Sequence, residues 1–213
     1  MGTQQESRKL NRYTSLPILL DLLRRRKIVL VDPSTWEDRN DADIIKEYQN
    51  RKKVSKLFTV CLSIGDETIH HWKTYAGGNS GCCIEFDEKK LLASLQGIEG
   101  VRWGDVDYKK ISEVLYNPIK LDNIPFTKRW PYRCDYEFRI LWEGETSLDT
   151  MEIDIDLSSI NRITLTQKMY DVVSKSIQEL LREKLGNRSI KIVRSTLYEN
   201  RRWIKAFEKR KPQ

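Results

Sequence analysis

Residues 57–86, LFTVCLSIGDETIHHWKTYAGGNSGCCIEF, carry the pattern that decides the fold class. Residues 57–63 are apolar or β-branched almost without a break, which predicts a buried strand. A helical segment over 67–75 follows and ends at a Gly-Gly pair, after which 81–86 again predict a strand. A strand, a short helix and a second strand in succession indicate a mixed α and β fold.

The flanking sequence extends this alternation in both directions. Further strands are predicted at 10–14, 28–31, 99–106, 136–142, 151–157 and 190–194. Further helices are predicted after Ser15, ending in basic residues, and at 34–50, 87–95 and 107–117. The longest predicted helix covers 167–185, with Val172, Val173 and Leu180 in its buried stripe. Because the chain has no internal repeat and no long linker, we expect a single α+β domain over 1–213 that ends in a basic helix and tail at 199–213.

Composition excludes several classes of protein. The 213 residues include 39% apolar residues, six Trp, nine Tyr and five Phe, which suffices for a folded core. No stretch approaches the roughly 18 apolar residues of a membrane span, and the amino terminus lacks the apolar segment of a signal peptide. We therefore expect a cytoplasmic protein that does not associate with membranes. The four cysteines lack zinc-site spacing, so no metal is expected.

The net charge of +7 is unevenly distributed, and part of it lies in the last residues of the chain. Trp203 and Phe207 are four residues apart, so one face of a terminal helix is expected to anchor on the protein. Its basic side chains are then predicted to bind nucleic acid, although solvated surface charge is the commoner explanation for such a run; they are Arg201, Arg202, Lys205 and Lys209.

Short motifs alone identify no chemistry, because phosphate-binding glycine loops and metalloprotease or esterase signatures are missing. His70 and His71 point about 100° apart on a helix, which favours surface or packing roles. A more informative pattern is an ordered series of blocks: RYTS at 12–15, IVL at 28–30, WEDRND at 36–41, CLS at 61–63, WKTYA at 72–76, GCCIEFD at 81–87, KRW at 128–130 and YEFR at 136–139. This series resembles an uncharacterised bacterial family, domain of unknown function 2971.

The same order of elements resembles the ADP-ribosyltransferase fold, a split sheet with flanking helices. The resemblance implies NAD as substrate, Glu137 as the catalytic carboxylate, and Arg12, Thr14 and Ser63 as cofactor-binding residues, with Tyr75 or Trp72 stacking on nicotinamide. A carboxylate stabilises the positive charge that develops on ribose, and an arginine suits a pyrophosphate.

Purely structural roles for these residues remain open. Glu137 and Arg139 share a strand face and can form an ordinary ion pair, and Ser63 can be a strand-end hydroxyl. Trp72 and Tyr75 can be core aromatics, and Arg12 can belong to a salt bridge.

Three functional hypotheses follow from the sequence. The preferred one is an ADP-ribosyltransferase-like enzyme, a bacterial toxin or anti-phage defence effector that modifies nucleic acid or a nucleic-acid-bound protein and is restrained by an inhibitory or defence-system partner. The alternative is a non-catalytic nucleic-acid-binding or regulatory module of the same fold. A metal-dependent nuclease that uses Asp38, Asp41 or the carboxylates of 152–156 is the third.

Overall fold

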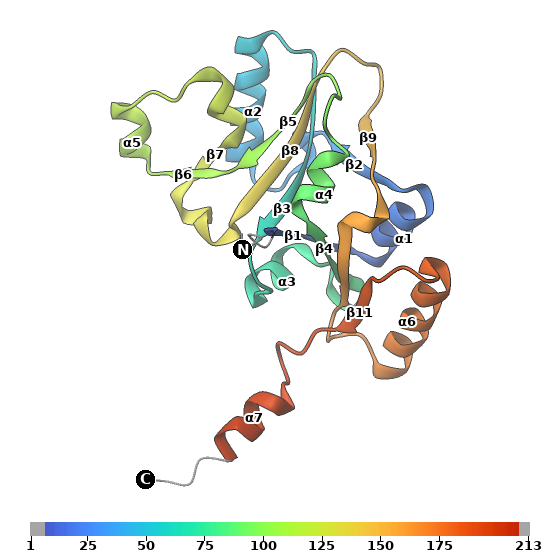
Figure 1. The fold of residues 1–213 in the computed structure, drawn as a ribbon. Coiled ribbons are helices and arrows are strands. Elements are labelled where there is room, and N and C mark those ends of the chain that lie inside the picture. The colour runs from blue at the N-terminus through green and yellow to red at the C-terminus, as the bar shows by residue number, and fades with distance from the viewer. Residues whose placement is uncertain (1–6, 209–213) are drawn as a thin grey trace, which may run out of the picture.

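The computed structural model describes residues 7–208, and within them a nine-stranded sheet forms the centre of the molecule (Figure 1). The strands of this sheet are β1 (Lys9–Ser15), β2 (Lys27–Val31), β3 (Lys56–Ile64), β4 (Gly81–Asp87), β5 (Val101–Asp105), β8 (Glu137–Gly144), β9 (Thr150–Asp154), β10 (Ile160–Leu165) and β11 (Lys191–Arg194). A separate parallel pair consists of β6 (Asp107–Lys109) and β7 (Thr127–Arg129).

The helices lie around this sheet. They are α1 (Leu16–Arg25), α2 (Arg39–Lys52), α3 (Ile69–Tyr75), α4 (Glu88–Ala93), α5 (Ile111–Tyr116), α6 (Asp171–Leu185) and α7 (Arg201–Glu208), with the longer 3-10 segments η3 (Leu121–Phe126) and η4 (Trp130–Asp135). The expected α+β class, a split sheet with flanking helices, is confirmed. Where a helix was expected over 107–117, the chain instead forms strand β6 before the shorter helix α5.

The split lies at strand β3. One edge of β3 pairs with β8 from Lys56 to Ser63. The other edge is divided, because β1 pairs with it only at its carboxyl end, through Ile64 and Ser63, and β2 pairs with it at Thr59. Strands β1 and β2 therefore diverge along one edge of β3, and helix α1 connects them.

Local sequence explains why these elements form. Ser15 has the extended backbone of a helix N-cap residue, and Pro17 lies in the first turn of α1, where its missing N–H costs nothing. Leu19 and Leu22 of that helix are buried in the main core. Burial of one such side chain stabilises the folded protein by about 1.5–3 kcal/mol. At the end of α3 the chain turns sharply, and a Cβ on Gly81 would lie 1.6 Å from the backbone oxygen of Ala76.

The carboxyl-terminal helices differ from expectation. Helix α6 begins only at Asp171, and its buried residues are Ser174, Leu181 and Leu185, whereas Val172, Val173 and Leu180 are exposed. The apolar residues of α6 thus spread over a wider face of the helix than the face that is buried. Helix α7 stands apart from the rest of the chain beyond β11 (Figure 1). Within residues 7–208 no helix is long and apolar enough to cross a membrane.

Candidate active site

A cavity of about 560 Å³ lies where β1 and β2 diverge. Its volume is typical of small-molecule sites, which span about 300–1,000 Å³. Five residues that the sequence singles out lie in its wall: Arg12, Thr14, Ser63, Tyr75 and Glu137. The split in the sheet therefore brings these residues, from four different elements, to one cavity.

Strand register explains how they meet. Asn11 of β1 lies opposite Ser63 of β3, and Ser63 lies opposite Glu137 of β8. Directly opposite residues on paired strands share a face, so these three side chains form a row across the sheet. Arg12 and Thr14 alternate to the other face of β1. They reach the same cavity because β1 leaves β3 after Asn11.

The Glu137 side chain is buried, and each of its carboxylate oxygens has a cationic partner. Arg139 donates from Nε to Oε1 at 2.5 Å, and Lys128 donates from Nζ to Oε2 at 3.0 Å. Burial acts to raise the pKa of Glu137, but the charges of Arg139 and Lys128 outweigh it and hold this pKa at about 2. Glu137 is therefore ionised at neutral pH and fixed in position.

Arg139 is itself held by helix α2. Its guanidinium donates to both carboxylate oxygens of Asp41, in the first turn of α2, and to the backbone oxygen of Pro125 at 2.8 Å. The guanidinium carbon also lies 5.2 Å from the centre of the Trp36 ring. A bidentate contact of this kind fixes orientation as well as charge, so Asp41 positions the arginine that positions Glu137.

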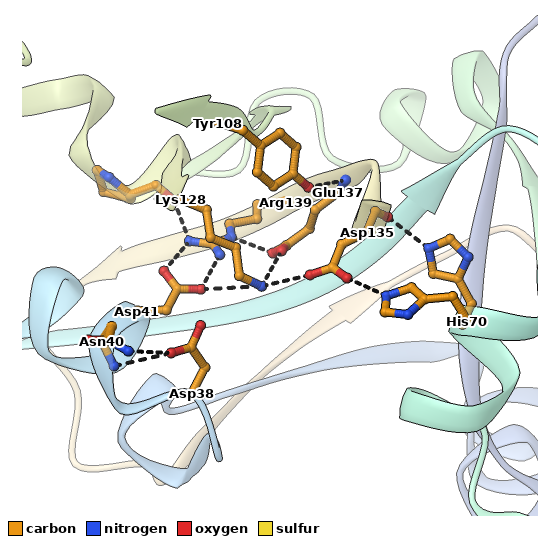
Figure 2. Close-up of polar contacts among 11 residues, drawn as sticks. Asp38, Asn40, Asp41, His70, Tyr108, Lys128, Asp135, Glu137 and Arg139 are labelled. Carbon is orange, nitrogen blue, oxygen red and sulfur yellow. Dashed lines mark hydrogen bonds and ion pairs between the residues drawn. The ribbon is translucent and has the colours of Figure 1, made fainter. Parts of the chain in front are cut away.

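On the other side of Glu137, Lys128 continues the network towards helix α3. Figure 2 shows the carboxylates of Asp41, Glu137 and Asp135 around the Lys128 ammonium group. The Lys128 nitrogen lies 3.1 Å from Oδ2 of Asp135, and Oδ1 of Asp135 lies 2.7 Å from Nε2 of His70. A continuous series of hydrogen-bonded and ion-paired side chains, the charged network, thus joins α2 to α3 along the cavity wall.

Arg12 differs from these paired groups. Within residues 7–208 its guanidinium makes no ion pair and no side-chain hydrogen bond, and burial lowers its pKa to about 10, an effect that the Cys82 and Cys61 thiols partly oppose. Arg12 therefore stays protonated at neutral pH.

Two further polar atoms of the cavity wall, the Tyr13 hydroxyl and Oδ2 of Asp38, are buried without a hydrogen-bond partner among residues 7–208. Unsatisfied groups of this kind are costly and are typical of a site that binds a polar ligand.

The other expected cofactor-binding residues have different settings. Ser63 is 6% exposed, and its hydroxyl makes only a long contact of 3.4 Å with the Asn11 carbonyl. Tyr75 is 44% exposed and contributes to the cavity wall. Trp72 does not line the cavity; it is buried edge-on against Tyr13, and its indole N–H donates to Glu67. The expectation that Trp72 stacks on a ligand is corrected accordingly, because its ring packs against Tyr13 in the core and its N–H is hydrogen-bonded to Glu67.

The basic residues predicted to bind nucleic acid lie far along the chain from the cavity wall. Arg201, Arg202 and Lys205 are exposed on α7, and Lys209 lies outside the described residues. Trp203 is 68% and Phe207 60% exposed, so their expected anchoring on the protein is wrong: the two rings contact each other, and no residue of α7 is buried.

The carboxylates considered for a nuclease are distributed between two places. Asp38 and Asp41 line the cavity, and Asp41 is paired with Arg139. Glu152 does not line the cavity; it lies on β9 and pairs with Arg25. Among residues 7–208 no group of three or more His, Cys, Asp or Glu is arranged to hold a metal ion.

Sequence reasoning missed the residues that surround Glu137. Lys128, Asp135 and His71 line the cavity, and none was predicted to be a site residue. Lys128 did belong to one of the ordered sequence blocks, which was the available signal. Tyr136, directly before Glu137, has φ +43°, a left-handed conformation that costs about 1–3 kcal/mol for a residue other than glycine and that clusters at functional sites.

Fold and cavity together define an α+β protein with a split sheet and a charged small-molecule cavity at the split. No family model matches the chain and no curated protein matches it, so membership of domain of unknown function 2971 is not confirmed. Among solved structures, Thermus sp. 2.9 DarT in complex with NAD+ is similar, with 11% identity, a TM-score of 0.46, and coverage of 91% of this chain and 98% of that chain. The same protein in complex with ADP-ribosylated ssDNA gives 12% identity, a TM-score of 0.46, and coverage of 91% and 97%. At these scores the likeness assigns no activity to this chain.

Proposed function

We propose that the chain is a cytoplasmic ADP-ribosyltransferase-like enzyme that consumes NAD. The observation that carries the proposal is the presence of two groups in one cavity: the Arg12 guanidinium, which has no ion-pair partner among residues 7–208, and the Glu137 carboxylate, which Lys128 and Arg139 keep ionised. NAD presents a pyrophosphate anion, and cleavage of its nicotinamide–ribose bond develops positive charge on the ribose. The cavity supplies the Arg12 cation for the pyrophosphate and the fixed Glu137 anion for the positive charge on the ribose.

Each group then has a defined role in the reaction. Arg12 binds the pyrophosphate, and the hydroxyls of Thr14 and Ser63 donate to ribose or to the nicotinamide amide. Tyr75, half exposed at the cavity wall, stacks on the nicotinamide ring. Glu137 stabilises the oxocarbenium-like transition state as nicotinamide leaves with the bonding electron pair. Because both of its oxygens already accept charged hydrogen bonds, Glu137 acts by its charge.

The acceptor in this proposal is a nucleic acid or a nucleic-acid-bound protein. Its support is the exposed basic face of α7, where Arg201, Arg202 and Lys205 can neutralise phosphates. An enzyme that consumes NAD and modifies such targets is toxic to its own cell. We therefore propose a role as a bacterial toxin or anti-phage defence effector that an inhibitory partner protein restrains.

The direct test supplies the purified protein with NAD labelled in the adenylate and with bacterial cell extract. The proposal expects nicotinamide release and transfer of label to acid-insoluble material, with nuclease and protease digestion identifying the acceptor. Glu137→Gln should abolish both signals. Absence of nicotinamide release from the wild-type protein would reject the proposal.

A second candidate function, non-catalytic binding of nucleic acid, is favoured by one observation. Helix α7 exposes basic and aromatic side chains together, and none of its residues is buried. Such a helix binds phosphates with a strong salt dependence and stacks its aromatic rings on bases. Tight, salt-sensitive binding of single-stranded DNA or RNA by a protein that leaves NAD intact would select this alternative.

A further inference from the structure

His70 lies beside two residues of the cavity wall and contacts Asp135 of the charged network. It belongs to α3, and its ring centre lies 5.4 Å from that of His71 and 6.3 Å from that of Tyr75, two residues of the cavity wall. The His70 side chain is 45% exposed, whereas the Asp135 side chain that contacts it is 5% exposed. His70 therefore presents an accessible imidazole held by a buried carboxylate.

The Asp135 residue is fixed by contacts on three sides. Lys128 binds Oδ2 at 3.1 Å, His70 binds Oδ1 at 2.7 Å, and Nε2 of His71 lies 2.8 Å from the Asp135 backbone oxygen. An ionised carboxylate accepts hydrogen bonds only, so Nε2 of a neutral His70 carries the hydrogen. Nδ1 then carries a free lone pair, and it has no hydrogen bond to any residue among 7–208.

The proposed transfer reaction needs a proton acceptor, and the two charged groups assigned to NAD, Glu137 and Arg12, do not provide one. Glu137 is a poor base, because both of its oxygens are in ion pairs and its pKa is held at about 2. The Arg12 guanidinium is protonated. An imidazole oriented by a carboxylate is the arrangement best matched to proton transfer near neutral pH.

We propose that His70, oriented by Asp135, is a second catalytic residue that takes the proton from the incoming acceptor group. This inference rests on the proposed ADP-ribosyltransferase function. The bond between ribose C1′ and the nicotinamide nitrogen breaks, and the nicotinamide keeps the electron pair. A bond forms between C1′ and the oxygen or nitrogen of the acceptor, whose proton moves to Nδ1 of His70 and then to solvent.

Two substitutions test this role. His70→Gln keeps a side-chain N–H for Asp135 but cannot take a proton, and His70→Ala leaves a solvent-accessible space. Lys73→Gln is the matched control, because Lys73 is exposed on the same helix and makes no side-chain contact with the network. Each variant is given labelled NAD and bacterial cell extract, and nicotinamide release and label transfer are measured separately, with and without added imidazole.

Both His70 variants should reduce label transfer by about 100-fold, the usual contribution of a general base. Their NAD affinity and unfolding midpoint should match those of the Lys73 control, and imidazole should restore transfer in His70→Ala. The inference is overturned if His70→Gln transfers normally, if imidazole restores nothing, or if a wild-type protein that releases nicotinamide labels no macromolecule. A wild-type protein that releases no nicotinamide instead rejects the proposed function itself.

Discussion

The Lys128 ammonium nitrogen lies 3.0 Å from the Glu137 carboxylate in the interior of the protein. Both side chains are less than 10% exposed, and Arg139, almost fully buried, occupies the other oxygen of Glu137. Removing so many charges from water is expensive, and apolar side chains of equal volume often stabilise a protein at least as well. This network is therefore better explained by the chemistry of the cavity than by stability.

The first prediction concerns the cost of breaking this network. Lys128→Met leaves Glu137 and Asp135 as buried carboxylates without their shared cation, so the free energy of unfolding should fall by about 3–5 kcal/mol. Lys46→Met is the control, because Lys46 is exposed on α2 and should change stability by less than about 0.5 kcal/mol. Urea unfolding measures both. Equal stability of the two variants would show that the buried Lys128–Glu137 ion pair contributes nothing to the free energy of unfolding.

The second prediction separates binding from stability at Arg12. Its guanidinium is buried and has no carboxylate partner among residues 7–208, so Arg12→Gln should not lower the unfolding midpoint without ligand. The dissociation constant for NAD should rise about 10- to 100-fold, because hydrogen bonds to a charged group contribute about 1.5–3 kcal/mol. Calorimetric titration measures the affinity, and Arg51→Gln on the exposed face of α2 is the control. Unchanged NAD affinity in Arg12→Gln would remove Arg12 from the site.

The third prediction is a pH dependence of stability. The pKa of Glu137 is lowered from 4.5 to about 2 in the folded protein, so the ionised form is favoured by folding. Its contribution is fully present above pH 4.5 and is lost as the pH falls towards 2. The difference in unfolding free energy between wild type and Glu137→Gln should therefore shrink steadily over this interval. A difference that stays constant between about pH 6 and about pH 3 is incompatible with the lowered pKa.

The fourth prediction concerns α7. Trp203→Ser and Phe207→Ser should leave thermal unfolding unchanged, because both rings are largely exposed and, among residues 7–208, contact each other. Replacing Arg201, Arg202 and Lys205 by Gln should weaken binding to single-stranded DNA or RNA. It should also reduce the slope of log affinity against log salt by about 0.7 for each phosphate that the helix no longer neutralises. An unchanged salt slope would place the nucleic-acid-binding surface elsewhere.

Sequence patterns predicted most of the elements, because most strands here are short, apolar and bounded by turns. The strand over 57–63, the helix over 67–75 and the strand over 81–86 correspond to β3, α3 and β4. Strand β10 was not predicted; it is buried because it pairs with β4 on one side and β11 on the other, and this pairing is a property of the tertiary structure. Apolar periodicity also predicted too wide a buried face for α6. The periodicity indicates which side chains can be buried, but not how much of the helix the rest of the protein covers.

The site was partly predictable for a related reason. Glu137 and Ser63 were singled out by the resemblance to the ADP-ribosyltransferase fold, and strand register places them opposite each other. The partners of Glu137 come from remote segments: Asp41 acts through Arg139 from 98 residues away, and Lys128 lies on the short strand β7. Burial and pairing at such separations follow from tertiary packing, so a single sequence does not reveal them.

Nicotinamide release from NAD by the wild-type protein and by Glu137→Gln tests the central claim most directly. The account predicts release by the wild type and a decrease of at least about 100-fold in the variant, since removing one preorganised charge from a transition state costs that much. The variant should still unfold cooperatively, which calorimetry can verify. Equal release by the two proteins, or none by the wild type, would contradict the account.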